Sequence, residues 1–215
     1  MNSGIFNSCN AYFAGTFRKI YGKYKTTDEG MDAWERHMES FGLGNYLGTD
    51  MPTGRPGRIP DKAYYDRAYG DNRWASSFII SNAIGQGEVA ATPIQLANMT
   101  AAIANRGFFY TPHIIKQIDG KASIDSRYTA RHQTTIDKEH FEPVVEAMAN
   151  VYRYGTAKWL KIPDIEIAGK TGTVENFTRI DGERVQLTDH SIFVAFAPVD
   201  KPKIALAVYI VHGYF

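Results

Sequence analysis

The sequence has 215 residues and a formal net charge of +1, with 44% hydrophobic and 22% charged residues. This composition is typical of a globular domain with a sizeable core. Because the basic residues are scattered, we expect no nucleic-acid partner. No apolar run approaches the roughly 20 residues that span a bilayer, and residues 1–4 begin no signal peptide, so we expect any membrane anchor to lie outside this chain. The single cysteine, Cys9, excludes an internal disulfide and indicates no particular compartment.

Two amphipathic helices are predicted at the start of the chain. The first covers residues 11–21, where apolar side chains recur at helical spacing and Asn10 occupies the N-cap position. The second covers residues 28–41 and ends at Gly42. We interpret their aromatic and methionine side chains as core packing. The next stretch, residues 42–74, has no sustained period and predicts a long ordered loop, either functional or a purely structural lid.

Two more helices are predicted in the middle of the chain. Thr92, Pro93 and Gln95 indicate a helix start, with threonine as N-cap, proline in the first turn and glutamine completing a capping box. This helix runs to Asn105. The other covers residues 137–152, whose apolar positions follow a helical period.

Three strands are predicted, at residues 165–174, 191–198 and 204–212. The last two are apolar on both faces, and their connection is so short that they must pair antiparallel. Two apolar faces need cover on both sides. We therefore predict an α/β (α+β) domain in which helices flank an antiparallel sheet on both faces.

The most informative stretch is GKTGT at residues 169–173. Small residues around Lys170 allow a ligand to approach the backbone, and they place one cation and two hydroxyls beside it. This pattern predicts an edge that recognises anions. The tripeptide SCN at residues 8–10 lies far upstream, directly before the first predicted helix.

Two glycine motifs suggest phosphate or dinucleotide binding but lack the rest of the pattern. A P-loop ending at residues 169–171 needs glycine at position 164, where the chain has Asp164, and a helix after the lysine. Residues 85–90 (GQGEVA) match a dinucleotide fingerprint, but the next helix is capped only at Thr92 and no acidic residue follows where a ribose contact needs one. We interpret residues 85–90 as a turn that joins two elements.

The six histidines show no paired metal-binding spacing. His190 stands beside Asp189 before a core strand, and we interpret it as structural. Cys9 has neither a second cysteine nor clustered histidines to accompany it, so we expect a small buried residue. No metal or other cofactor is predicted.

The serine, asparagine and lysine motifs form a coherent set for acyl transfer through a serine ester. Such chemistry needs a proton path, an anchor for the substrate amide, a cation for a carboxylate and amide donors for the oxyanion. Ser8 fits the first role and Asn10 the second. Lys170, Thr171 and Thr173 fit the third, and the backbone N–H of Thr173 fits the fourth.

The sequence contains no serine that is followed three positions later by lysine. The nearest match, residues 16–19 (TFRK), has threonine in place of serine and lies inside the first predicted helix, so we interpret it as chance. The chain therefore resembles the downstream part of a catalytic domain, with the nucleophile on a segment outside it.

K-T-G and S-x-N are two of the three signature elements of penicillin-binding proteins and class A β-lactamases. Three longer runs, IGQGEVAATPIQLANMTAAIANRG, YGTAKWLKIPDIEIAGKTGT and DHSIFVAFAPVDKPKIALAVYI, resemble the transpeptidase domain of class B penicillin-binding proteins. NSCNAYF and FGLGNYLGTDMPTGRPGRIP resemble the elongation-type members of that class. The resemblance covers residues 7–211.

The resemblance implies a D,D-transpeptidase that cross-links peptidoglycan stem peptides through a serine acyl-enzyme and is acylated by β-lactam antibiotics. It implies the penicilloyl-serine transferase (β-lactamase-like) fold, an antiparallel sheet flanked by helices beside a mostly helical lobe. It also implies a location at the periplasmic face of a bacterial inner membrane, with a membrane-embedded glycan polymerase as partner of regions outside this chain.

The resemblance also implies a role for each matching residue. Ser8 is the proton shuttle between nucleophile and leaving group, and Asn10 holds the acyl-side amide. Lys170 provides the electrostatic field and forms a hydrogen bond with Ser8. The remaining residues of the motif bind the terminal carboxylate of the peptide or the carboxylate of a β-lactam: Thr171, Gly172 and Thr173.

Two departures from the family pattern limit these implications. The Ser-x-x-Lys helix is missing, and residues 213–215 stand where the family continues into a C-terminal helix that packs on the sheet. We therefore predict that residues 1–215 are a partial transpeptidase domain, inactive alone, with apolar surface uncovered near Ser8 and the sheet. The alternative is a non-catalytic penicillin-binding-like recognition or scaffold module. A β-lactamase is disfavoured because the longer runs resemble transpeptidases.

Overall fold

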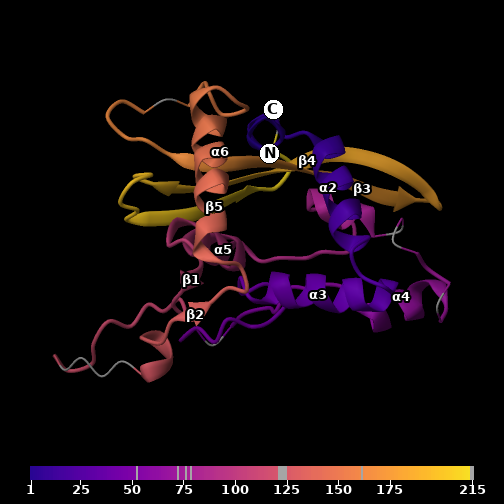
Figure 1. Ribbon diagram of the computed structural model, residues 1–215, viewed down its shortest axis with the longest axis horizontal. Coiled ribbons are helices and arrows are strands. Elements are labelled where there is room, and N and C mark those ends of the chain that lie inside the picture. The colour runs from indigo at the N-terminus through magenta and orange to yellow at the C-terminus, as the bar shows by residue number, and fades with distance from the viewer. Residues whose placement is uncertain are drawn as a thin grey trace.

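The computed structural model describes residues 1–51, 53–71, 73–75, 77, 79–120, 125–160 and 162–213. They form an antiparallel sheet with helices packed against it and a mostly helical lobe beside it (Figure 1). The helices are α1 (Asn2–Phe6), α2 (Asn10–Tyr21), α3 (Thr27–Glu39), α4 (Lys62–Tyr69), α5 (Pro93–Ala104) and α6 (Glu142–Arg153), and the 3-10 helices are η1 (Ile80–Ile84), η2 (Ser126–Tyr128) and η3 (Lys138–His140). No described helix combines the length and the apolarity needed to span a bilayer.

The main sheet has the strand order β3–β4–β5, comprising β3 (Ala168–Ile180), β4 (Glu183–Ala197) and β5 (Ile204–Ile210). Both pairings are antiparallel. Within the described part of the chain β3 has a neighbouring strand on one side only, so its other edge is free to bond to a ligand. A separate two-stranded ladder joins β1 (Phe108–Phe109) and β2 (His132–Gln133).

All three predicted strands are present, and the first two are longer than the sequence indicates. β3 and β4 continue as a hairpin to a turn at Asp181 and Gly182, whose φ angles are +52° and +86°. A bulge between Val174 and Asn176 separates the hairpin from the rest of the pair. The hairpin residues are largely polar and exposed, and so they lack the apolar alternation by which a strand is recognised.

Helix α2 begins one residue earlier than predicted. Asn10 is already helical, and the N-cap is Cys9, which has extended backbone and makes no side-chain capping bond. The assignment of Asn10 as N-cap is therefore wrong. Downstream, α2 packs into a largely aromatic cluster of buried residues: Phe17, Tyr21, Met31, Tyr65, Trp74 and Ile79.

The prediction of a loop over residues 42–74 is wrong in part, because residues 62–69 form α4. Asp61 caps this helix by accepting a hydrogen bond from the backbone N–H of Tyr64 at 2.7 Å. The helix has only eight residues, too few for a helical period to be evident. Its buried Tyr65 ties it to the cluster around α2.

The remaining helices follow their local signals. The capping box of α5 is confirmed, with Thr92 and Gln95 bonding reciprocally. Helix α3 lies close to its predicted bounds, and Thr26 caps it. The helix predicted over residues 137–152 is divided into η3 and α6, with Pro143 in the first turn of α6.

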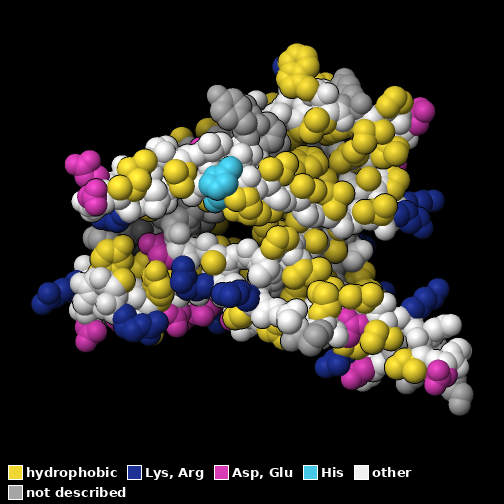
Figure 2. Space-filling model, turned by 180° about the vertical axis from the view of Figure 1, so that it is seen from behind, with side chains coloured by type: hydrophobic (Ala, Val, Ile, Leu, Met, Phe, Trp, Pro, Cys, Tyr) yellow, Lys and Arg dark blue, Asp and Glu magenta, His cyan; other side chains and the backbone are white. Residues whose placement is uncertain are grey.

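One face of the sheet is packed, and apolar side chains on β5 remain exposed. α6 packs against β3, and α5 packs against β4 and β5. In Figure 1, α6 crosses in front of the sheet, and Figure 2 shows apolar side chains gathered over the sheet when seen from behind. On β5, the alternate residues Leu206, Val208 and Ile210 are 38%, 46% and 51% exposed. The prediction of helices on both faces is therefore wrong for the described residues, whereas the predicted uncovered apolar surface is confirmed on the sheet.

The exposed apolar residues of β5 favour self-association. In Val208→Lys, a charge in the middle of this surface opposes burial, so we expect weaker self-association in sedimentation velocity. Ile118→Lys is the control, because Ile118 is 54% exposed on the segment between β1 and β2. Equal effects of the two substitutions would contradict the assignment of this surface.

Candidate active site

Lys170 and Ser8 meet although 162 positions separate them. The Nζ of Lys170 donates a hydrogen bond to Ser8 Oγ at 2.8 Å and another to the Thr171 carbonyl oxygen at 2.6 Å. The ammonium is thus fixed between β3 and the turn that precedes α2. A cation in contact with a hydroxyl is an arrangement that can direct a proton and attract an anion.

Ser8 owes its position to the tight turn between α1 and α2. Its φ is +54°, in the left-handed region that costs a non-glycine residue about 1–2 kcal/mol. The N–H of Ser8 donates to Ile5 O at 3.1 Å and that of Cys9 to Gly4 O at 2.9 Å, which closes the end of α1. A strained backbone that presents a functional hydroxyl is a recurrent feature of active sites.

Lys170 is half-buried, and in the described part of the chain it forms no salt bridge. Burial lowers the pKa of its ammonium below lysine's usual range, because removal from water disfavours the charged form. A partly desolvated cation without a carboxylate partner is suited to binding an anionic ligand or assisting proton transfer.

The two glycines beside Lys170 serve different purposes. A Cβ on Gly169 would lie 2.8 Å from the Val194 carbonyl oxygen and 2.9 Å from Phe193 Cζ, so only glycine fits against β4. A Cβ on Gly172 would meet nothing closer than Ile192 Cβ at 3.7 Å. The described neighbours therefore leave room at Gly172.

Thr171 is linked to the segment that follows α6. Its Oγ1 lies 2.7 Å from Thr156 Oγ1, and the Thr156 N–H donates to Phe6 O at 3.2 Å. Thr156 therefore ties the end of α1 to the strand that carries Lys170. The sequence did not single out Thr156, since its only signal is its place in the run YGTAKW.

Thr173 is exposed on β3, and its carbonyl oxygen accepts a hydrogen bond from Gln86 Nε2 at 3.4 Å. In an antiparallel strand the N–H and C=O of one residue point to the same side. Because Gln86 lies outside the sheet, the N–H of Thr173 also points to the free edge of β3. This N–H can donate to an oxyanion or to the carbonyl of a bound peptide.

Asn10 and Cys9 are both exposed at the start of α2, next to Ser8. The expectation of a buried Cys9 is therefore wrong, because the N-cap position leaves this residue at the surface.

The structure thus brings together all the residues that the sequence selected, on the start of α2 and on the strand facing it: Ser8, Asn10, Lys170, Thr171, Gly172 and Thr173.

His190 lies in a small cluster of aromatic rings, next to the end of the pairing between β4 and β5. Its Nδ1 accepts a hydrogen bond from the His212 N–H at 3.2 Å, and its ring lies 5.3 Å from that of Tyr209. The described residues contain no group of three or more histidine, cysteine, aspartate or glutamate side chains that could hold a metal.

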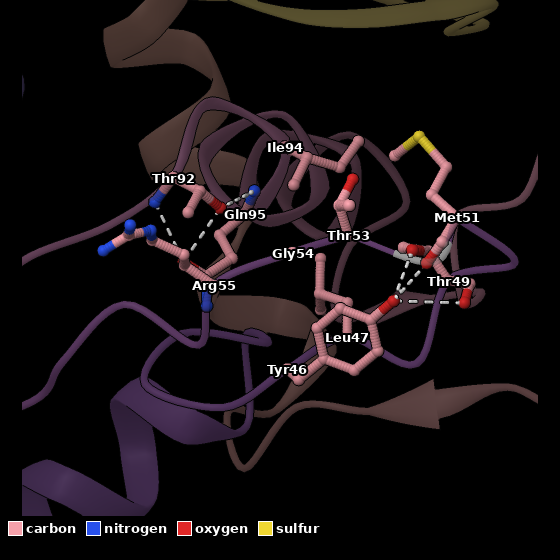
Figure 3. Close-up of a pocket in the computed structure, with 10 residues that line it drawn as sticks. All are labelled: Tyr46, Leu47, Thr49, Met51, Thr53, Gly54, Arg55, Thr92, Ile94 and Gln95. Carbon is pink, nitrogen blue, oxygen red and sulfur yellow. Dashed lines mark hydrogen bonds between the residues drawn. The ribbon is translucent and has the colours of Figure 1, made fainter.

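A cavity of about 130 Å³ lies between residues 46–55 and the first turn of α5 (Figure 3). The hydroxyl of Tyr46 donates to the Met51 carbonyl oxygen at 2.8 Å at one side of the cavity. At the other side, Gln95 Nε2 donates to the carbonyl oxygens of Asn45 and Pro56. The lining includes neither Ser8 nor any residue of β3, so we assign the candidate site to the free edge of β3.

An antiparallel sheet with a free lysine-bearing edge, facing a serine before a helix, is characteristic of the penicillin-binding transpeptidase class. The chain belongs to the penicillin binding protein transpeptidase domain family, whose profile matches residues 1–214. The predicted resemblance to this family and its fold is therefore confirmed.

Particular relatives agree with the predicted subtype. The chain is 33% identical over 217 residues to the peptidoglycan D,D-transpeptidase MrdA of Acinetobacter baumannii, an alignment that covers 97% of this chain and 31% of that protein. Among solved structures, Pseudomonas aeruginosa PBP2 in complex with WCK 5153 superposes with a TM-score of 0.79 at 31% identity, over 99% of this chain and 43% of that one. Helicobacter pylori PBP2, solved with MreC, gives 0.74 at 25% identity, over 99% and 36%. The chain spans about a third of the length of the curated relatives it matches.

The lowered pKa of Lys170 predicts a pH dependence of stability. Between this lowered value and the ordinary pKa of about 10.4, the unfolded chain binds more protons than the folded one, so the free energy of unfolding rises with pH. Lys170→Met removes this contribution. We expect the parental chain to gain stability relative to Lys170→Met as the pH rises from about 7 to about 10, in denaturant titrations.

Lys203→Met is the control for this experiment, because Lys203 is exposed. A stability difference between the parental chain and Lys170→Met that stays constant over this pH range would contradict the pKa shift.

Proposed function

We propose that this chain is part of the catalytic domain of a serine-type peptidoglycan D,D-transpeptidase, with the nucleophile and general base on an upstream Ser-x-x-Lys segment. The observation that supports it most strongly is the contact between Lys170 Nζ and Ser8 Oγ at 2.8 Å, at the free edge of β3. The relatives named as D,D-transpeptidases support the same reaction. On this proposal the chain alone is inactive.

The proposed reaction begins when the nucleophilic serine attacks the carbonyl carbon of the last peptide bond of a stem peptide. An ester bond forms, the C–N bond breaks, and the terminal residue leaves as an amine. The serine proton passes to the general base and reaches the leaving nitrogen through the hydroxyl of Ser8. An acceptor amine of a second stem peptide then attacks the ester, which forms the cross-link and returns the serine.

The residues of this chain bind and polarise the substrate. The N–H of Thr173 at the free edge donates to the oxyanion, and Asn10 holds the acyl-side amide. The charge of Lys170 attracts the terminal carboxylate, and the hydroxyls of Thr171 and Thr173 donate hydrogen bonds to it. A β-lactam presents a carbonyl and a carboxylate to the same groups, and its ring opening forms a stable acyl-enzyme.

The wider setting we propose rests on the family resemblance. We place the protein at the periplasmic face of a bacterial inner membrane, with stem peptides as substrates and a glycan polymerase as partner of regions outside this chain. Helicobacter pylori PBP2 was solved in complex with MreC, which supports an MreC-like protein as a further partner.

The role of Lys170 is tested in the full-length protein with the Ser-x-x-Lys segment. Lys170→Ala slows acylation by labelled penicillin by about 10²-fold or more, the effect of losing a positioned electrostatic group. Lys170→Arg is also impaired, since a planar guanidinium cannot replace a compact ammonium. Near-parental rates in both variants would refute the assignment, and Lys203→Ala controls for charge.

Incubation of this chain alone with excess penicillin tests the location of the nucleophile. Without an activated serine no ester forms, so intact-mass spectrometry shows no stoichiometric adduct. An adduct on any serine or threonine of this chain would show that the nucleophile lies within it.

The backbone of Thr173 is tested by three substitutions in the full-length protein. Thr173→Ser keeps both the hydroxyl and the N–H and is mild. Thr173→Ala keeps only the N–H and is slower, and Thr173→Pro deletes the donor and abolishes acylation. A folded proline variant that acylates at the rate of the alanine variant would rule out the oxyanion role.

A further inference from the structure

The turn at residues 85–87 brings a side-chain amide to the free edge of β3. Gln86 is half-buried, and its Nε2 donates to the Thr173 carbonyl oxygen at 3.4 Å. Its Oε1 has no hydrogen-bond partner among the described residues. An amide offers both donors and an acceptor, so this group can bond to the backbone of a peptide that lies beside β3.

The conformation of the turn depends on its two glycines. Gly85 and Gly87 have φ angles of +75° and +76°. A Cβ on Gly87 would lie 2.5 Å from Ser81 Oγ and 2.9 Å from Asn82 Oδ1, so the turn packs closely on η1. The Gln86 N–H also donates to Ser81 O at 3.2 Å. The position of Gln86 therefore follows from the position of η1.

Beneath the turn, three residues form a closed ring of hydrogen bonds through their side chains and the backbone N–H of Glu88. Tyr65, fully buried on α4, donates its hydroxyl to Glu88 Oε2 at 2.8 Å and accepts from Asn82 Nδ2 at 2.8 Å. The Glu88 N–H donates to Asn82 Oδ1 at 3.3 Å. The ring joins α4, η1 and the segment that leaves the turn. Since Asn82 is also buried, breaking the ring leaves a buried polar group unsatisfied.

Arg58 holds the segment after the turn from another side. Its Nε donates to the Glu88 carbonyl oxygen at 2.9 Å, and its backbone exchanges hydrogen bonds of 2.6 and 2.9 Å with Ala90. Both ends of the turn are thus anchored in the helical lobe, which fixes the position of Gln86 relative to α4 and η1.

We propose that Gln86 is a specificity-determining residue that contacts the peptide substrate, and that Tyr65, Asn82 and Glu88 are positioning residues that hold it at the edge of β3. This inference rests on the proposed function, because the peptide in question is the one that pairs with Thr173. An extended peptide beside β3 bonds to the backbone of this edge strand, including the N–H of Thr173. Gln86, which already bonds to the Thr173 carbonyl oxygen, offers its unpartnered Oε1 to a backbone N–H of that peptide. A small β-lactam has no such extension.

The test compares two reactions of the full-length protein: turnover of a peptide ending in D-Ala-D-Ala, and acylation by benzylpenicillin. Gln86→Ala lowers kcat/KM for the peptide by about five- to tenfold, through KM, as expected for one lost hydrogen bond. Its acylation by benzylpenicillin stays near parental. If peptide turnover in Gln86→Ala equals parental turnover, the inference is overturned.

The positioning residues are tested with matched variants. Glu88→Ala produces the same peptide-selective loss, whereas Glu88→Gln retains an acceptor for the Tyr65 hydroxyl and restores turnover. The double variant Glu88→Ala with Gln86→Ala shows no further loss, because the two changes remove the same contact between Gln86 and the peptide. Additive losses, or a loss that is equal for peptide and penicillin, would make the ring merely structural and overturn its positioning role.

Tyr65→Phe removes the hydroxyl and keeps the ring in the core, and we expect the loss seen in Glu88→Ala. Tyr128→Phe is the control, because the Tyr128 hydroxyl is buried without a partner in the described part of the chain. If Tyr65→Phe does not fold, the two Glu88 variants decide the inference. A parental protein that reacts with neither compound would refute the proposed function itself. A parental protein that reacts with both compounds, and whose rates do not change in Gln86→Ala, would refute only the inference about Gln86.

Discussion

The site depends on keeping one lysine ammonium half-buried against a serine hydroxyl. Burial disfavours the charge, and the hydrogen bonds from Lys170 to Ser8 and to the Thr171 carbonyl partly offset this cost. The bond to Ser8 exists only while the turn that precedes α2 lies against β3. Every contact that fixes these two elements therefore contributes to the chemistry of the site.

Two separate cores fix them. One core packs α6 and α1 against the sheet around Ala168 and Phe196, directly below the lysine. The other holds α2 through Phe17 and Tyr21 against α4 and η1. Thr156 connects the sheet to the α1–α2 turn, and Gln86 connects the helical lobe to Thr173. The candidate site is thus bounded by elements from both cores, and a shift between them would separate Lys170 from Ser8.

Elements with local determinants were predictable. The start of α5 followed from a capping box within four residues, and the antiparallel pairing of β4 with β5 followed from their short connection. Helix α4 was not predictable, because Tyr65 is buried by partners far along the chain. The far hairpin of β3 and β4 was missed because its residues are exposed and largely polar. Helices were predicted on both faces of the sheet, and this was an overestimate. The apolar residues of β5 indicate that a face needs to be buried, but they do not indicate which residues of the chain bury it.

The sequence by itself determined which chemical groups are available: a lysine among small residues with two threonines, and a serine and an asparagine before an amphipathic helix. These are properties of short segments, and the family resemblance rests on them together with the longer runs that surround them. The family resemblance implied that Lys170 bonds to Ser8. Only the tertiary structure decided the geometry of that contact, that the Thr173 N–H faces a free edge, and that Gln86 and Thr156 join the site. The physical reason is that these contacts link residues as far apart as 162 positions, and their distances arise from the packing of two cores that no local pattern encodes.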